Sequence, residues 1–305
     1  MASRLPFISV IVPALNEERT IRECLASLLR MDYPQERREI LVVDNGSTDR
    51  TAEIVKSFPV RYLREERRGA SHARNRGIEA SQGDIFAFTD ADCVVTTGWL
   101  RELVLGFDSE EVGIVAGEVV AYPPETTVEL YTAKRKPFFF QGRSLSSPVP
   151  PWFMGGSVAI RREVVNQIGL FDSRFTGAGA EDIDYSWRFF QLVSLEMIYR
   201  PKAIAFHHHR LTTWTLFKQY QGYGYGQAVL CRKYQEKRLW GWRRELKAYG
   251  DISLAVLALG RAAILSMLRG RETTRFSYLY CELVRKLGAR IGFISGTLRP
   301  GARYG

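Results

Sequence analysis

Two carboxylates follow directly after a short apolar segment of this chain. Phe86 and Phe88 lead through Thr89 to Asp90 and Asp92, which are one residue apart. The apolar segment predicts a buried strand, whose end would place both carboxylates at the rim of a sheet. Carboxylate oxygens there can bind a divalent cation and, through it, a phosphate-bearing ligand, although Asp-x-Asp also occurs in solvated turns. The spacing predicts a metal-dependent site for a nucleotide diphosphate.

The elements that must position this pair alternate between strands and helices. Apolar runs predict strands at residues 8–13, 40–44, 60–63 and 84–89. Between them, helices are predicted at 16–30, from the turn at 45–49 to about residue 58, and at 70–80. Ser47 or Thr48 is a suitable N-cap for the second helix. We therefore expect an α/β fold with a mostly parallel, open sheet and flanking helices. The polar residues at 13–17, 44–47 and 89–92 should then converge at the carboxyl ends of the strands.

The rest of the chain predicts a second region of different character. Further strands are expected at 112–122, 157–160, 195–199 and 203–206, and a helix is expected after Glu181. Beyond His209 the sequence becomes helical, aromatic and basic. Two domains are expected, at residues 1–210 and 211–305. The second is a helical extension.

Six motifs in this order resemble a family 2 glycosyltransferase of the GT-A fold over about the first 210 residues. They are Val10-Ile11-Val12-Pro13-Ala14-Leu15-Asn16-Glu17, Val43-Asp44-Asn45-Gly46-Ser47-Thr48-Asp49, Ala73-Arg74-Asn75-Arg76-Gly77, Asp90-Ala91-Asp92, Gly155-Gly156-Ser157 and Glu181-Asp182-Ile183-Asp184. The resemblance implies a Rossmann-like GT-A domain. It also implies an enzyme that takes its sugar from a nucleotide diphosphate sugar, with a UDP-sugar favoured.

The resemblance implies a donor site built from the first loops. The residues it assigns to the donor are Pro13, Asn16, Glu17, Asp44, Arg74, Asn75 and Asp90. Asp92 would coordinate Mn²⁺ or Mg²⁺, and Asp90 would meet the ribose or the metal through water. A carboxylate such as Asp44 can accept a hydrogen bond from a uracil N–H, but a capping turn would look the same. The alternative for Arg74 and Asn75 is a solvated helix face.

The acidic pair Glu181 and Asp182 is implied at the acceptor site. In inverting members of the family the aspartate removes the proton from the attacking hydroxyl, so Asp182 is the expected general base, with Glu181 orienting the acceptor. An acidic helix N-terminus would have the same sequence. Arg188 is a candidate ion partner of the pair. The need for a base favours a sugar or glycolipid hydroxyl over a lipid phosphate, which is already ionised.

Two further groups of residues are candidates for this site. Trp152, Gly155 and Gly156 are assigned to the acceptor. Trp152 can stack on an acceptor sugar, although an aromatic residue there can also be core packing. His207 and His209 at the end of a strand are candidate metal or diphosphate ligands, with a structural role as the alternative.

The charge is concentrated in the C-terminal region. Residues 232–305 carry 16 Lys and Arg against 5 Asp and Glu, whereas residues 1–231 carry 27 against 28. The apolar run 252–268 contains Arg261, which is costly in a spanning helix and suits an interfacial one. We expect peripheral contact with the inner face of the cell membrane; a helix packed on the core or a dimer contact is the alternative. The basic region contains no recognised nucleic-acid-binding module, so no nucleic-acid partner is expected.

Cysteine usage and the N-terminus indicate a cytoplasmic protein. The four cysteines form no CxxC pair, which argues against a zinc or disulfide site. The first residues lack the apolar region and cleavage site of a signal peptide, so secretion is not expected.

Three competing functions are distinguishable on the sequence or by experiment. A nucleotidyltransferase commonly begins with a glycine-rich phosphate loop, and residues 13–17 contain no glycine. Processive synthesis is disfavoured because Gln219 is followed three residues later by Gly222, where processive synthases have arginine. A non-catalytic scaffold or sensor would bind the nucleotide sugar without turnover. The favoured function is metal-dependent, inverting sugar transfer to a hydroxyl acceptor in polysaccharide or glycolipid synthesis.

Overall fold

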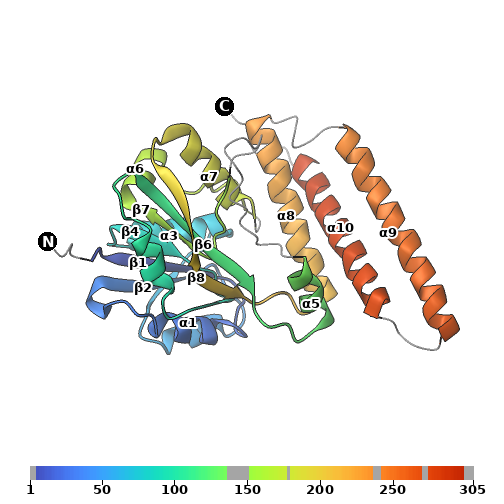
Figure 1. Ribbon diagram of the computed structural model, residues 1–305, viewed down its shortest axis with the longest axis horizontal. Coiled ribbons are helices and arrows are strands. Elements are labelled where there is room, and N and C mark those ends of the chain that lie inside the picture. Colours follow the sequence, from blue (N-terminus) through green and yellow to red (C-terminus); the bar gives the residue numbers. More distant parts are fainter. Residues whose placement is uncertain (1–4, 136–150, 177–178, 236–241, 270–273, 299–305) are drawn as a thin grey trace. The chain divides into compact units, whose positions relative to one another are not determined.

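The computed structural model describes residues 5–135, 151–176, 179–235, 242–269 and 274–298 (Figure 1). The chain forms two compact units. The first comprises Met1–Tyr122, Phe138–Thr176 and Glu181–His208, and contains a sheet with its helices. The second comprises Pro123–Pro137, Gly177–Ala180 and His209–Gly305, and its described elements are helices.

The first unit is built on an eight-stranded sheet with the order β3-β2-β1-β4-β7-β6-β8-β5. The strands are β1 (Ile8–Ala14), β2 (Arg38–Asp44), β3 (Arg61–Arg64), β4 (Ile85–Phe88), β5 (Cys93–Val95), β6 (Val112–Ala121), β7 (Val158–Arg161) and β8 (Glu196–His207). The strands β1 to β4 pair in parallel, as do β6 and β8, while β7 and β5 are antiparallel to their neighbours. The predicted mostly parallel α/β sheet is confirmed.

The two faces of the sheet are buried by separate sets of helices. On one face Val10 and Val12 of β1 pack with α1 (Ile21–Leu29), α2 (Thr51–Lys56) and α4 (Trp99–Leu105). On the other face Ile11 packs with α3 (Ala70–Ala80), α6 (Arg162–Ile168) and α7 (Glu181–Leu192). Because successive side chains of a strand point to opposite faces, a continuous apolar strand is buried on both sides.

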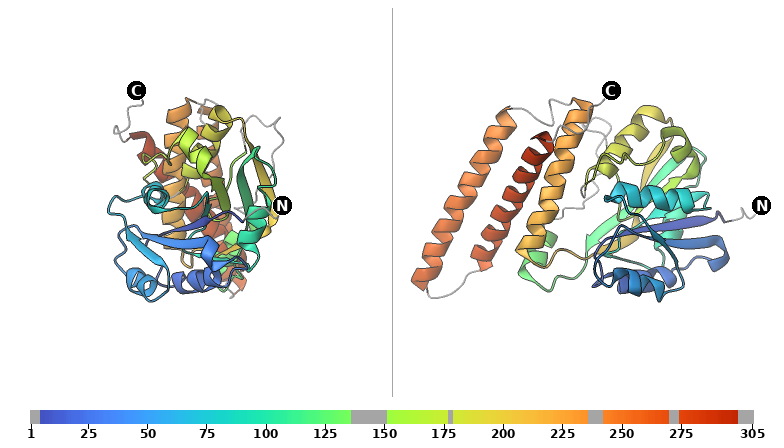
Figure 2. Two further views of the ribbon diagram at one scale, coloured as in Figure 1. Left: turned by 90° about the vertical axis from the view of Figure 1, so that its left-hand side faces the viewer. Right: turned by 180° about the vertical axis from the view of Figure 1, so that it is seen from behind.

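The second unit contains four described helices. They are α5 (Thr127–Lys134), α8 (Thr213–Tyr234), α9 (Trp242–Arg269) and α10 (Thr274–Leu298). Within this unit α10 lies between α8 and α9, as the right-hand view of Figure 2 shows. The predicted C-terminal helical region is confirmed.

The first two helices begin later than predicted. Asn16 adopts a left-handed φ of 56°, and its side-chain Oδ1 accepts a hydrogen bond from Thr48 N at 2.8 Å. Residues 16–20 therefore form a turn, and α1 begins at Ile21. The helix α2 begins at Thr51, whose N–H donates to Asp49 Oδ1 at 2.9 Å, so neither predicted residue caps it. The strands expected at 195–199 and 203–206 are one strand, β8.

Gly77 of α3 marks a close approach between that helix and the sheet. A Cβ at Gly77 would collide with Ile11 Cγ2. We expect Gly77→Ala to lower the free energy of unfolding by roughly 1–2 kcal/mol, because overpacking outweighs the better helix propensity of alanine. Gly260 of α9 is a matched control, because a Cβ there meets no heavy atom within 4 Å. Equal stability of the Gly77→Ala and Gly260→Ala variants in urea would contradict this packing.

Candidate active site

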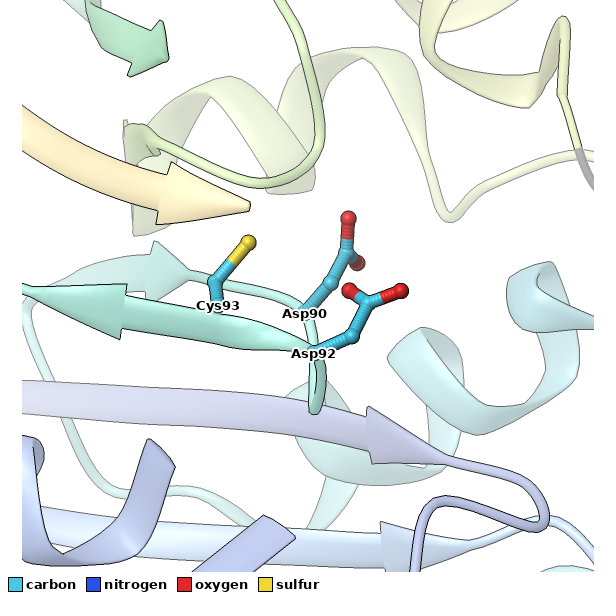
Figure 3. A group of neighbouring side chains, drawn as sticks. All are labelled: Asp90, Asp92 and Cys93. Carbon is cyan, nitrogen blue, oxygen red and sulfur yellow. The ribbon is translucent and has the colours of Figure 1, made fainter. Parts of the chain in front are cut away.

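The acidic pair lies at the edge of the sheet where β4 ends. Thr89 Oγ1 donates to Gly156 O at 2.9 Å, and Cys93 N donates to Asp90 O at 3.0 Å, so the pair is held in a tight turn between β4 and β5. Asp92 is buried and Asp90 is half-buried. In Figure 3 their carboxylates lie next to each other, with the Cys93 thiol nearby. One potential ligand atom from each of the three lies within 4.8 Å of the others.

The two carboxylates fit a hard divalent cation better than the thiol does. Burial raises the pKa of Cys93 well above its ordinary value, and the negative charges of Asp92 and Asp90 raise it further. A protonated thiol is a poor ligand, and sulfur suits soft metals, whereas carboxylates suit Mg²⁺ and Mn²⁺. The donor set at Asp90 and Asp92 therefore fits Mn²⁺ or Mg²⁺.

A buried arginine joins the acidic pair to the start of α7. Arg74 Nη2 donates to Asp90 Oδ1 at 3.0 Å, and Nη1 donates to Glu181 Oε1 at 2.6 Å. Burial opposes the charged form of Arg74, but the charges of Glu181, Asp90 and Asp182 hold its pKa above the ordinary value. Arg74 is 4% exposed, so this is a buried charge network.

The two glycines predicted at the acceptor site pack directly on this network. A Cβ at Gly155 would lie 2.5 Å from Arg74 Nη2, so the guanidinium occupies the space that a side chain would need. A Cβ at Gly156 would lie 3.4 Å from Asp90 Oδ2. The half-buried Trp152 precedes Phe153, whose N–H donates to Ser186 Oγ of α7 at 3.2 Å. The segment 152–156 thus connects α7 with the acidic turn.

Asp182 has the electrostatic environment of a base that works near neutral pH. Burial, followed by the negative charge of Glu181, raises its pKa to about 7, against the opposing charge of Arg74. Its Oδ1 accepts a hydrogen bond from Ile183 N at 2.8 Å. Glu181 Oε2 is buried and accepts no hydrogen bond from the described residues.

Arg188 does not pair with Glu181 or Asp182, contrary to prediction. Its Nε donates to Asp184 Oδ2 at 3.0 Å, four residues earlier in α7. Its other nitrogens donate to the carbonyls of Ile168 and Leu170. The ion partner of Glu181 is Arg74 instead, and Arg188 fixes the segment after α6 against α7.

The loops after β1 and β2 converge as predicted. Asn16 N donates to Ser47 Oγ at 2.9 Å, and Glu17 N donates to Thr51 Oγ1 at 2.8 Å. Pro13 lies opposite Val43 in the parallel register of the two strands. These contacts place Pro13, Asn16 and Glu17 beside the end of β2.

Asp44 ends β2 and is fully buried. Its Oδ1 accepts from Ser47 N at 2.9 Å and its Oδ2 accepts from Tyr62 Oη at 2.9 Å. A carboxylate has about four acceptor positions, so about two remain for further donors. Tyr62, which the sequence reasoning did not single out, fixes the orientation of this carboxylate.

Asn75 is placed differently from its predicted role. Its Nδ2 donates to Phe171 O at 2.8 Å, and its Oδ1 accepts from Phe171 N at 2.9 Å. The amide is therefore committed to the backbone of Phe171. A second motif asparagine also binds backbone: Asn45 Nδ2 donates to the carbonyls of residues 65 and 67, and Oδ1 accepts from Gly69 N. Asn45 thus fixes the loop that leads into α3 and Arg74.

The histidines at the end of β8 are placed individually. His207 lies opposite Cys93 in the antiparallel pairing of β5 and β8, and its Nε2 is 3.4 Å from Asp92 Oδ2. His208 stacks on Tyr122 with ring centroids 3.8 Å apart. His209 is buried and begins a segment of the second unit, so its predicted metal role stays a prediction. His207 therefore lies beside Asp92, and its metal role also stays a prediction.

Comparison with protein families gives one match over more than half of the chain. Residues 9–169 match the model described as glycosyl transferase family 2. The matched segment begins in β1 and ends after α6, and so includes the acidic turn and Arg74.

Two curated relatives are similar to this chain over about 60% of its length. The chain is 34% identical over 207 residues to glycosyltransferase AglE of Haloferax volcanii, and the aligned region covers 62% of this chain and 66% of that protein. It is 27% identical over 205 residues to the β-monoglucosyldiacylglycerol synthase of a Nostoc species, covering 60% of this chain and 41% of that protein. The chain therefore spans less than two thirds of the length of these relatives.

Solved structures share the fold at low sequence identity. A mannosyltransferase from Pyrobaculum calidifontis, in complex with GDP-Man and Mn²⁺, has a TM-score of 0.61 at 21% identity, covering 97% of this chain and 88% of that one. Glucosyl-3-phosphoglycerate synthase from Mycobacterium tuberculosis, with Mn²⁺, UDP and phosphoglyceric acid, has a TM-score of 0.52 at 22% identity, covering 74% and 78%. These likenesses show a common fold.

Proposed function

Because its family model matches more than half of the chain, this protein belongs to glycosyl transferase family 2, and we propose that it transfers a sugar from a nucleotide diphosphate sugar to a hydroxyl acceptor. The observation that carries the proposal is the pair of bonds from Arg74 to Asp90 and to Glu181. They join a candidate site for the departing diphosphate to a candidate base for the incoming hydroxyl.

The leaving-group side of the reaction is assigned to the acidic turn. Asp92 and Asp90 would hold Mn²⁺ or Mg²⁺, with His207 beside Asp92. When bound, the cation would neutralise charge that develops on the departing nucleotide diphosphate. Arg74 keeps Asp90 in place and adds a fixed positive charge close to it.

The acceptor side is assigned to the start of α7. The acceptor hydroxyl oxygen attacks the anomeric carbon, the bond to the diphosphate breaks, and the hydroxyl proton passes to Asp182. Attack on the face opposite the leaving group inverts the anomeric centre. Glu181 Oε2 would accept a hydrogen bond from the acceptor, and Trp152 would stack on its ring. Gly155 and Gly156 leave the space that Arg74 and Asp90 occupy.

The donor nucleotide is assigned to the loops after β1 and β2. Pro13, Asn16 and Glu17 would line the base and ribose, and the buried Asp44 would accept a hydrogen bond from a uracil N–H. This chemistry supports a UDP-sugar. The solved neighbours named above contain both GDP-Man and UDP, so the choice of nucleotide requires direct measurement.

The acceptor class and location extend the proposal. The Nostoc relative is named a β-monoglucosyldiacylglycerol synthase, and we infer a glycolipid or polysaccharide hydroxyl as the acceptor here. The enzyme would then act at the cytoplasmic face of the membrane, in peripheral contact through its basic C-terminal helices.

Metal-dependent donor binding is the direct test. In calorimetric titrations of the full chain, a UDP-sugar such as UDP-glucose should bind with Mn²⁺ and lose on the order of ten-fold or more in affinity with chelator, because the diphosphate loses its cation. Asp92→Asn should reproduce the loss while Asp108→Asn, an exposed aspartate, should not. GDP and dTDP conjugates are the comparison ligands.

The outcomes of this titration separate the competing functions. Equal affinity for the UDP-sugar with Mn²⁺ and with chelator would contradict the metal site. Tighter binding of a GDP conjugate would contradict the UDP preference. Metal-dependent binding without turnover on any glycolipid or sugar acceptor would favour the non-catalytic sensor.

A further inference from the structure

The helix α9 carries its small residues inward and its large apolar residues outward. Ala255 and Ala262 are each 6% exposed within the second unit. The large apolar side chains that are at least 36% exposed are Leu246, Tyr249, Leu254, Val256, Leu257, Ile264 and Leu265. We call these seven residues the outer face of α9. A surface helix of a soluble protein normally has the opposite arrangement, with its large apolar residues buried.

Among the described helices of the second unit, α8 and α10 pack closely without using the outer face. Gly288, Gly292 and Gly296 recur every four residues along α10 and lie against α8. A Cβ at Gly288 would be 2.6 Å from Phe217 O, and a Cβ at Gly292 would collide with Gln221 O. Close backbone approach through small residues is typical of helices that pack in lipid, where large apolar residues face the acyl chains.

The charges on the outer side of α9 are positive. Lys247 and Arg261 are exposed, and no acidic side chain is exposed among the described side chains 246–266. The partly buried neighbours on α10 continue this character: Lys286 Nζ donates to Asp251 O at 3.1 Å, and Arg290 Nη2 donates to Tyr249 Oη at 3.1 Å. Long basic side chains can lie along apolar surface and reach phosphate groups with their heads.

We propose that the outer face of α9 docks on an anionic phospholipid bilayer, with the helix in the plane of the interface. Leu254, Leu257 and Ile264 enter the upper acyl region, while Lys247 and Arg261 bind lipid phosphates. The inference deepens the membrane contact included in the proposed function by naming the surface and its partner. It does not depend on sugar transfer.

Two alternatives for the outer face of α9, a dimer contact and a membrane-spanning helix, fit these observations less well. A second copy of the chain would bring Arg261 against another basic, apolar face, and no acidic side chain described on α9 is exposed to pair with it. A spanning orientation is suggested by length and composition, since Leu246–Ser266 is apolar enough to cross a membrane and 11% of it is buried. However, α10 packs along α9 and carries the charged Glu282, Arg285 and Lys286, which would enter the hydrocarbon with it.

Vesicle sedimentation of the full chain tests the proposal. We expect binding to vesicles of phosphatidylglycerol and phosphatidylcholine, and weaker binding to phosphatidylcholine alone. The double variant Leu254→Gln, Leu257→Gln should lose roughly 100-fold in partition coefficient, about ten-fold per leucine removed from the acyl region. The matched control Leu105→Gln, Leu192→Gln alters two leucines of the first unit that are 52% and 61% exposed, and should bind as the unaltered chain does.

The outcomes distinguish this inference from the catalytic proposal. Vesicle binding that is equal in the α9 variant and the control would overturn the inference. A dimer seen in sedimentation velocity would also overturn the inference, if the α9 substitutions convert it to monomer and leave vesicle binding unchanged. Resistance of the bound chain to extraction by high salt and carbonate would instead indicate a spanning helix and also refute interfacial docking. Donor binding measured by calorimetry should be the same in these variants and in the unaltered chain. An absence of donor binding would therefore contradict the proposed function alone and not the docking of α9.

Discussion

Replacing Asp182 by asparagine is expected to lower the turnover of sugar transfer by about 10²- to 10⁴-fold, the usual contribution of a positioned general base. The amide has nearly the same size as the carboxylate but cannot take the proton of the acceptor hydroxyl. The proposed donor site lies with Asp90, Asp92 and the loops after β1 and β2, so the dissociation constant of the donor should change little.

The pH dependence of the rate gives this prediction a second readout. Burial and the charge of Glu181 raise the pKa of Asp182 to about 7, so its carboxyl group is protonated and inactive below that pH. The rate of the unaltered enzyme should therefore rise as the pH increases through about 7 and level off above it. The Asp182→Asn variant should lack this rise.

An exposed aspartate of the same unit provides the control. Asp108→Asn should leave both the rate and its pH profile unchanged. If the Asp182→Asn variant keeps its full rate, the base is elsewhere and the assigned mechanism is wrong. If the rate falls but the pH profile keeps its rise near 7, another group is responsible for the titration and Asp182 acts by position.

The parallel half of the sheet was predictable because its signal is local. The strands β1, β2 and β4 are apolar runs followed by polar turns, and each helix between them has its own periodicity. The antiparallel strands β5 and β7 depend on pairing with strands far along the chain, such as Val94 with Phe206. No local pattern carries that information, so the mixed order of the sheet was not foreseen.

The candidate site was predictable in its residues but not in its connections. Arg74, Asp90 and Glu181 were each identified by motif, yet the bonds between them span 16 and 107 residues. Only the fold brings such positions together. The error on Arg188 has a local cause: Asp184 lies one helical turn before it, whereas Glu181 lies two turns away. The spacing therefore already favoured Asp184.

Asn75 shows why a motif residue need not touch a ligand. The asparagine and the arginine before it occupy adjacent positions of α3, and only the arginine reaches the acidic turn. The Asn75 amide instead holds the Phe171 backbone, and the Phe171 ring lies beside Arg74, with its centroid 5.8 Å from the guanidinium carbon. Asn75 thus acts on the site indirectly, by positioning the Phe171 ring that lies beside Arg74.

Replacing Arg74 by methionine is expected to lower the free energy of unfolding by about 3–5 kcal/mol, the usual result of removing one partner from a buried ion pair. Glu181 would be left buried without its cation, and Asp90 would lose its fixed partner. Methionine has a similar length, so the loss would be mainly electrostatic. Arg76→Met is the control, because Arg76 is exposed on the same helix. Urea unfolding of the two variants measures the difference.

A double substitution separates the charge network from simple packing. If the cost of Arg74→Met is the stranded charge of Glu181, then adding Glu181→Gln should recover part of the lost stability, and the two changes should be strongly non-additive. Loss of the nearby positive charge should also raise the pKa of Asp182, so any residual activity of Arg74→Met should rise at a higher pH than in the unaltered enzyme. Additive costs with an unmoved pH profile would show that Arg74 fills space and does not couple the two halves of the site.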